Sequence, residues 1–358
     1  MLYKYHYVKE HKMHKLNQHF LFFIRKIRNV KKRAKYEPTT YFHYSFLNKT
    51  GKIAPHRKEN KKLNDKFKIF FETFKKLDDS EKLKFYKLIL FSKDLHLYFE
   101  NSLINVSVMH KDRISEILGN DSFSHLMSEL WDSLKTNSWE IDKHYEEIFN
   151  HLPESRICTF CGINPLSHPQ SYRADYDHLA FKGDYPISAI NLKNMAPSCS
   201  ECNQKYKHDT DVFYKSDKTR RVFNYPFLNF INVQLDFLGT IFPSTDVSNL
   251  NGKWEIQIQP DTELTRSWDE VYKIRERYVR DILLTDYNTW IGQFKQELKD
   301  HGIKVMDENC LKKYFIMHFR RYGKDKLQKR YIVKSSLYKY LYKCNNSVLY
   351  NQLIKEIN

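Results

Sequence analysis

Glycine, nucleotide-binding loops and long apolar runs are scarce or missing in this chain. Only nine of its 358 residues are glycine, and it contains neither a Gly-x-x-x-x-Gly-Lys-Ser/Thr phosphate loop nor a Gly-x-Gly-x-x-Gly fingerprint. Any dependence on ATP would therefore have to come from a partner. No apolar stretch reaches the length of about 18 residues that a membrane span needs. The longest apolar run near the N-terminus, residues 20–24, is too short for the core of a signal peptide.

Cysteine is also rare, and its arrangement is informative. Four of the six cysteines form two Cys-x-x-Cys pairs, Cys158 with Cys161 and Cys199 with Cys202. Each pair can direct two thiolates from a tight turn at one ion, and two such turns complete a tetrahedral zinc site. A closed four-thiolate site leaves no position for substrate, so the predicted Zn²⁺ is structural. With these four assigned to zinc, cysteine usage is typical of the reducing cytoplasm, where we expect the protein to reside.

The remaining composition favours a mostly helical protein with substantial cores. Hydrophobic residues make up 41% of the chain and aromatic residues 15%, which is ample for buried cores in about two or three domains. The predicted fold class is α+β, mostly helical. The other two cysteines, Cys310 and Cys344, are expected to be buried thiols rather than a disulfide.

Positive charge is concentrated at the N-terminus. Residues 1–76 hold 21 Lys/Arg against 5 Asp/Glu, whereas the remaining 282 residues hold 39 against 38. A segment of this kind is expected to bind a polyanion, and the phosphate backbone of nucleic acid is the obvious one. Apolar residues recur at helical spacing in two stripes: Leu16, Phe20, Phe23, Ile24, Ile27 and Val30, then Leu63, Phe67, Phe70, Phe74 and Leu77. Residues 1–76 are thus predicted to be a basic helical nucleic-acid-binding region; the alternative is two core-packed helices with solvated charged faces.

Three further regions follow. Residues 77–153 are predicted to be an acidic helical subdomain, because residues 77–149 carry 8 basic against 14 acidic side chains. Residues 154–262 would hold the zinc module and a β-hairpin, indicated by alternation at residues 233–237 and 254–258; this hairpin is expected to extend the sheet of the module or to cover its edge. Residues 263–358 are predicted to be a basic helical region, in which eleven Lys/Arg and one acid lie between Leu311 and Lys343. The aromatic residues of this block are more typical of a core than of base stacking.

The 37 residues between the two cysteine pairs exceed the roughly 15–20 of a plain zinc ribbon, so a folded insert is expected. The insert carries Asp177-His178 and the string from Asn191 to Pro197, and Asn203 directly follows the second pair. Residues 155–209 resemble an HNH nuclease of the ββα-metal type, in which an Asp-His pair ends a strand, a central Asn fixes a loop and Cys-x-x-Cys-Asn-x-x-Lys opens a helix. The resemblance implies a zinc-stapled ββα-metal core.

The resemblance also implies roles for individual residues. His178 would be the general base, Asp177 and Asn203 would bind a catalytic Mg²⁺ or Mn²⁺, and Asn194 would hold the catalytic loop in shape. These residue types suit the chemistry, since a divalent ion prefers oxygen ligands and a neutral imidazole can take a proton from water. Adjacent strand residues point to opposite faces, so His178 is expected opposite Asp177. His208 is either a third metal ligand or a surface or phosphate-contacting histidine.

Other polar residues of the insert have weaker predictions. Lys205 and Lys207 are expected to contact DNA phosphates. Lys182 is expected either to contact phosphate as well or to be an ordinary surface residue. Asp175 shares a strand face with Asp177, so it either supports that ligand or is solvated.

The resulting hypothesis is a metal-dependent HNH endonuclease that hydrolyses phosphodiester bonds in DNA, and we expect that DNA to be double-stranded. The string Asp-His-Leu, Tyr-Pro and Asn-Met-Ala-Pro-x-Cys-x-x-Cys-Asn is also similar to HNH effectors of bacterial anti-phage systems, such as the Septu type paired with an ATPase. That narrower resemblance implies a defence role and an ATPase or other regulatory partner. Two alternatives are a DNA- or RNA-binding protein with an inactive or regulatory HNH module that works with a partner enzyme, and an interaction protein whose acidic helices dock a catalytic partner.

Overall fold

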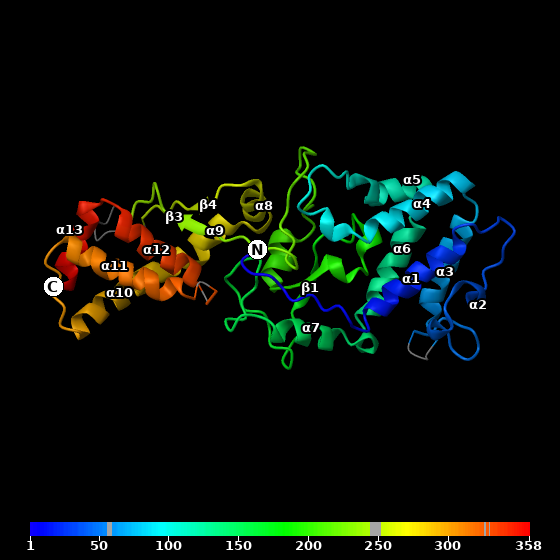
Figure 1. The fold of residues 1–358 in the computed structure, drawn as a ribbon, viewed down its shortest axis with the longest axis horizontal. Helices are drawn as coiled ribbons and strands as arrows, with labels where there is room; N and C mark the ends of the chain where they lie inside the picture. Colours follow the sequence, from blue (N-terminus) through cyan, green and yellow to red (C-terminus); the bar gives the residue numbers. More distant parts are fainter. Residues whose placement is uncertain (56–58, 244–251, 326, 329) are drawn as a thin grey trace. The chain divides into compact units, whose positions relative to one another are not determined.

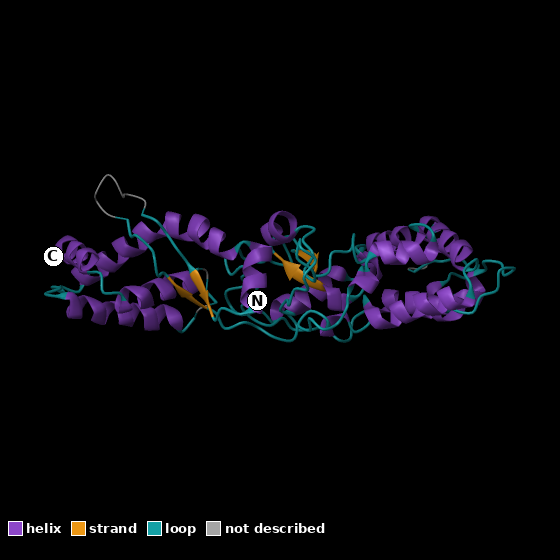
Figure 2. Ribbon diagram, turned by 90° about the horizontal axis from the view of Figure 1, so that it is seen from above, coloured by secondary structure: helices purple, strands orange, loops and turns teal. Residues whose placement is uncertain are grey.

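The computed structural model describes residues 1–55, 59–243, 252–325, 327–328 and 330–358 (Figure 1). Helices account for 52% of the chain and the strands form two small two-stranded sheets (Figure 2), which confirms the mostly helical α+β class. No described helix is both long and apolar enough to cross a membrane. The chain forms two compact units, which are described separately: unit 1 comprises residues 1–4, 153–166 and 229–358, and unit 2 comprises residues 5–152 and 167–228.

Unit 2 begins with a bundle of amphipathic helices. Its helices are α1 (His14–Ile27), α2 (Pro38–Tyr41), α3 (Lys61–Phe74), α4 (Asp79–Ser92), α5 (Lys111–Leu118), α6 (Ser122–Leu134) and α7 (Ile141–Asn150). Short 3-10 turns lie among them: η1 (Tyr44–Phe46), η2 (Leu95–Leu97), η3 (Ser107–Met109) and η4 (Asn137–Trp139). The two predicted N-terminal stripes are confirmed as the buried faces of α1 and α3.

Aromatic rings form the core of this bundle. The Phe23 ring lies edge-on to the Phe67 ring with centroids 4.9 Å apart, and Phe70 packs 5.6 Å from both Phe85 and Phe123. The basic residues of α1 and α3 therefore surround a core that these helices share with α4 and α6. The boundary expected at residue 76 falls within unit 2, because apolar faces on both sides of it bury one another.

The smaller part of unit 2 has the order strand, loop, strand, helix. Strand β1 (Asp175–His178) pairs antiparallel with β2 (Met195–Ser198), and Asp177 lies opposite Ala196 in the register. The connecting loop contains the 3-10 turns η5 (Pro186–Ser188) and η6 (Leu192–Asn194). A π-helical segment, η7 (Glu201–Lys207), begins shortly after β2.

Unit 1 contains the second sheet and the C-terminal helices. Its elements are β3 (Gln234–Asp236), β4 (Gln257–Gln259), α8 (Glu263–Tyr272), α9 (Ile274–Tyr278), the π-helical η9 (Val279–Leu283), α10 (Leu284–Asp300), α11 (Glu308–Gly323), α12 (Tyr331–Lys343) and α13 (Ser347–Ile357). Of the aromatic residues in the basic block, Phe315 and Tyr338 are buried as expected of core residues, whereas Tyr314, Phe319, Tyr322 and Tyr331 are half-buried. Cys310 and Cys344 are free thiols but half-buried, so the prediction that they are buried is wrong.

The predicted hairpin forms, but it does not extend the sheet of the zinc module. Strands β3 and β4 pair antiparallel with each other, and among the described residues neither pairs with β1 or β2. Strand β3 packs instead on α12, where the Leu235 amide donates to the Ser336 hydroxyl at 3.4 Å. Residues 244–251, which connect the two halves of the hairpin, lie outside the described residues.

Candidate metal centre and active site

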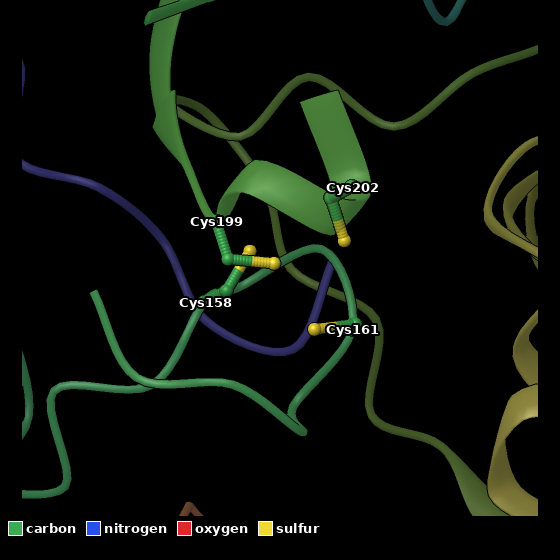
Figure 3. Close-up of side chains that lie close together, drawn as sticks. All are labelled: Cys158, Cys161, Cys199 and Cys202. Atoms are coloured by element: carbon green, nitrogen blue, oxygen red, sulfur yellow. The ribbon is translucent and has the colours of Figure 1, made fainter. Parts of the chain in front are cut away.

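The four paired cysteines converge as the spacing predicts. Their sulfur atoms all lie within 4.8 Å of one another, and all four side chains are buried. Figure 3 shows the sulfurs of Cys158, Cys161, Cys199 and Cys202 pointing toward a common centre. In a tetrahedral zinc–thiolate site with bonds of about 2.3 Å, sulfurs lie about 3.8 Å apart. If the sulfurs move slightly closer together, the cluster can therefore bind a metal ion such as Zn²⁺.

The first cysteine pair sits on a tight turn that glycine makes possible. The Gly162 amide donates to the Cys158 carbonyl oxygen at 2.8 Å, and Gly162 has a φ of +66°, a conformation that side chains with a Cβ disfavour. The Ile163 amide donates to the Cys161 sulfur at 3.4 Å, an interaction that favours a thiolate. The turn thus presents two sulfurs to one point and stabilises their charged form.

A separate cavity lies at the end of β1 in unit 2. It has a volume of about 430 Å³. Its lining comes from α6, β1, the loop after β1 and the segment around η7: Trp131, Lys135, Arg173, Asp175, Tyr176, Asp177, His178, Phe181, Lys182, Asn203, Gln204, Lys207 and His208. Asp177 and His178 both line this cavity, as do Asp175 and Tyr176 before them on the strand, and the expectation that His178 and Asp177 face opposite sides stays a prediction.

His178 is held in one orientation. Its Nε2 lies 2.9 Å from the Ala189 carbonyl oxygen, which accepts only if Nε2 carries the proton. The described residues offer no hydrogen-bond partner to Nδ1, which is then the atom with the available lone pair. Burial lowers the pKa of His178 to about 3. The ring is therefore neutral near pH 7 and can accept a proton at Nδ1.

Asp177 is buried against a lysine that sequence analysis placed elsewhere. The Lys207 ammonium lies 2.8 Å from Asp177 Oδ1, and both side chains are at most 2% exposed. It also donates to the His178 carbonyl oxygen at 2.8 Å. Lys207 was expected on a DNA phosphate, but the structure buries it, because the π-helical turn brings its side chain back over β1 and the buried carboxylate requires a counter-charge.

Asn194 holds the loop between the two strands. Its side chain is fully buried; Oδ1 accepts from the Ala180 amide at 2.7 Å, and Nδ2 donates to the Ala180 carbonyl oxygen at 2.9 Å and to the Ser188 hydroxyl at 3.0 Å. These bonds fix the loop that carries Ala189, the partner of His178. Asn194 lies outside the cavity lining and acts on the site only through this loop.

The remaining predicted ligands lie at the cavity rim. Asn203 is half-buried and lines the cavity. His208 also lines it, but its side chain is exposed and its Nδ1 lies 3.1 Å from Asp209 Oδ1. Asp175 accepts a hydrogen bond from Gln204 Nε2 at 2.8 Å, which ties β1 to the helical turn. Asp175 thus has a structural contact of its own and is not merely solvated.

The two other predicted phosphate-contacting lysines remain accessible. Lys182 is half-exposed at the cavity and Lys205 is exposed, with its ammonium 5.4 Å from the centre of the Tyr206 ring. Lys205 is absent from the cavity lining, whereas Lys182 belongs to it. Both stay predictions as contacts to phosphate.

Six residues of the cavity were not identified from the sequence: Trp131, Lys135, Arg173, Tyr176, Phe181 and Gln204. The Trp131 ring meets the His178 ring edge-on at 4.4 Å, and Lys135 and Arg173 add basic side chains to the lining. Trp131 lies on the buried face of α6, and its spacing gave no sign that α6 would lie over β1. Lys135 and Arg173 are single charges without a local motif, so no sequence signal distinguished them from ordinary surface residues.

The chain matches no family model, and comparison with curated proteins and with solved structures likewise finds no match.

Proposed function

We propose that the cavity at the end of β1 is the active site of a metal-dependent endonuclease of the HNH type. The observation that carries the proposal is the state of His178: a neutral imidazole whose Nε2 is occupied by the Ala189 carbonyl and whose Nδ1 is available, in a cavity that Asp177 and Asn203 also line. A general base needs such an available lone pair, and catalysis at neutral pH also needs a higher pKa than the value of about 3 to which burial lowers that of His178 in the described state. The strand–loop–strand–helix order and the resemblance of residues 155–209 to HNH nucleases support the proposal.

In this reaction each residue of the cavity has a separate task. His178 Nδ1 accepts a proton from the attacking water, and the Ala189 carbonyl stabilises the resulting imidazolium through Nε2. Lys182 attracts the phosphodiester, whereas Lys135 and Arg173 pair with Asp132 and Asp142 at 2.7 and 3.0 Å and so contribute less net positive charge. Asn194 acts as a positioning residue, because it fixes the loop that holds His178.

The donor set suits a hard divalent ion such as Mg²⁺ or Mn²⁺. Asp177 and Asn203 provide a carboxylate and an amide oxygen on the same cavity, and such oxygens are the ligands these ions prefer. When bound there, the ion would neutralise charge on the scissile phosphate. Lys207 already neutralises one oxygen of Asp177 in the described state.

The test uses supercoiled plasmid with the full-length protein in Mg²⁺, in Mn²⁺ or in EDTA. Wild type should give nicked or linear products only with a divalent ion, and His178→Ala should abolish them while plasmid affinity in EDTA is unchanged. His208→Ala is the matched control: it removes an imidazole from the same cavity, but an exposed one, and should keep activity. Cleavage by His178→Ala at the wild-type rate would reject the assignment of the base.

A second function is favoured by the ion pair at the centre of the site. Because Lys207 supplies a buried positive charge to Asp177, the cavity is balanced in charge without a divalent ion. A nucleic-acid-binding protein with an inactive or regulatory HNH module would show this state permanently. Salt-sensitive binding of DNA or RNA by wild type, with no product at any concentration of Mg²⁺ or Mn²⁺, would support this alternative.

The proposal also covers the nucleic acid that is cut and the biological role of the cutting. Double-stranded DNA as the target is supported by the excess of 16 positive charges in residues 1–76. A role in bacterial defence rests on the Septu-like string. An ATPase as a separate partner is supported by the same string and by the absence of a nucleotide-binding loop from this sequence. Purification of the tagged chain from its host and identification of a stoichiometric ATPase would test the partner.

A further inference from the structure

Unit 1 contains a second cavity, formed between the C-terminal ends of α10 and α11. Its volume is about 510 Å³, within the range of roughly 300–1,000 Å³ that is typical of small-molecule sites. The residues that line it are Glu297, Leu298, His301, Ile303, Tyr314, Met317, His318, Arg320, Arg321 and Lys324. All of them belong to unit 1, and none belongs to the cysteine cluster or to the proposed nuclease site.

The charged side chains of this cavity leave an excess of positive charge. Arg321 pairs with Glu297, with guanidinium–carboxylate distances of 2.9 and 3.1 Å. Arg320 and Lys324 are exposed and make no ion pair among the described residues. One acid therefore faces three fixed positive charges, and two of these are available to an anion.

The cavity also has an apolar wall and a buried acceptor. Met317 is 52% exposed, and the buried Leu298 and half-buried Ile303 also line the cavity. His318 is buried and its Nε2 lies 3.7 Å from Glu297, while the buried Nδ1 has no hydrogen-bond partner. Burial lowers the pKa of His318 to about 4, so Nδ1 or Nε2 of the neutral ring can accept a hydrogen bond.

We infer that this cavity binds a nucleotide, with the base against Tyr314 and Met317 and the phosphate on Arg320 and Lys324. A planar base can stack on the wall that Tyr314 and Met317 contribute to the cavity. A phosphate satisfies the two cations that lack ion-pair partners. The ligand has this chemistry whether it is a free mononucleotide or an unpaired nucleotide of a strand.

Basic residues near a helix C-terminus also interact favourably with the helix dipole, and that effect alone could place Arg320 and Lys324 on the last turn of α11. It does not explain why these two cations, which make no ion pair among the described residues, line a cavity of about 510 Å³ that also contains Tyr314 and Met317. The combination of an aromatic and apolar wall with two available cations in one cavity is what favours a ligand of mixed apolar and anionic character.

The experiment measures binding to the full-length protein by isothermal titration calorimetry in EDTA, with AMP, adenosine, inorganic phosphate and a short single-stranded oligonucleotide. The test variant is Arg320→Gln with Lys324→Gln. The matched control is Lys299→Gln with Lys313→Gln, which removes two exposed positive charges from the same two helices outside the cavity.

AMP should bind more tightly than either adenosine or phosphate, and the test variant should weaken it at least about tenfold, since charge-assisted bonds to phosphate are lost. The control should match wild type. Binding of the oligonucleotide but not of AMP, with the same loss in the test variant, would identify the strand as the source. Equal affinity for AMP and phosphate, equal losses in test and control, or no binding of either nucleotide form would overturn the inference.

Discussion

Replacing Lys207 by methionine removes the positive charge beside Asp177 and keeps a flexible side chain of similar length. The two charged atoms are 2.8 Å apart in a place that water barely reaches. At an effective dielectric constant of about 20, two unit charges at that separation attract by about 6 kcal/mol. Part of this attraction only offsets the desolvation of the pair, and loss of one partner from a buried pair costs about 3–5 kcal/mol. We expect Lys207→Met to lower the free energy of unfolding by that amount.

Urea denaturation followed by tryptophan fluorescence measures this change. Lys205→Met is the matched control, because Lys205 is exposed and lies on the same helical turn; it should change the unfolding free energy by less than about 0.5 kcal/mol. Combining Lys207→Met with Asp177→Asn removes both charges and should recover most of the loss. The reasoning fails if Lys207→Met costs no more than Lys205→Met, or if the double variant is as unstable as the single one.

The same variants show whether a divalent ion can take the place of the ammonium. In Lys207→Met, Asp177 loses the ammonium of Lys207, so Mn²⁺ should raise the urea midpoint of this variant more than that of wild type. The double variant lacks the carboxylate and should not respond. An equal response of all three proteins would place the binding of Mn²⁺ elsewhere.

Three further predictions concern the zinc cluster, a turn and a buried histidine. Purified protein should release one Zn²⁺ per chain to a metallochromic dye on thiol modification, and Cys202→Ser should lose it while Cys310→Ser retains it. Gly162→Ala should destabilise the protein by at least about 1–2 kcal/mol, because its φ is +66° and the new Cβ would lie 2.4 Å from a leucine methyl group. The control is Gly292→Ala in α10, where the new Cβ meets no atom within 4 Å and the change should be neutral or stabilising. Burial lowers the pKa of His144 to about 3, so the unfolded chain binds a proton at His144 at a higher pH than the folded protein does. The difference in unfolding free energy between wild type and His144→Phe should therefore fall by about 2–3 kcal/mol in favour of the variant between pH 7.5 and pH 4.5. A difference that stays constant in urea titrations at the two pH values would contradict this.

Local pattern predicted the helices and the hairpin of this protein well. The stripe from Leu16 to Ile27 is buried along α1, and alternation around Leu235 and Ile258 marks paired strands. Such patterns are short-range, since a helix or strand buries one face wherever it packs. They did not specify the partner of the hairpin, which is α12 rather than the sheet of the zinc module, because many apolar faces could have accepted it.

The sequence by itself determined the cysteine cluster, because two Cys-x-x-Cys turns and a shared preference for one ion leave few other arrangements. It also indicated Asp177 and His178 as neighbours at the end of a strand. Only the tertiary structure decided that Lys207 returns to Asp177, that the Ala189 carbonyl leaves His178 Nδ1 available, and that Trp131 lies against the imidazole. These contacts join segments whose local sequences are compatible with many partners, so packing and the need to pair buried charge selected among them.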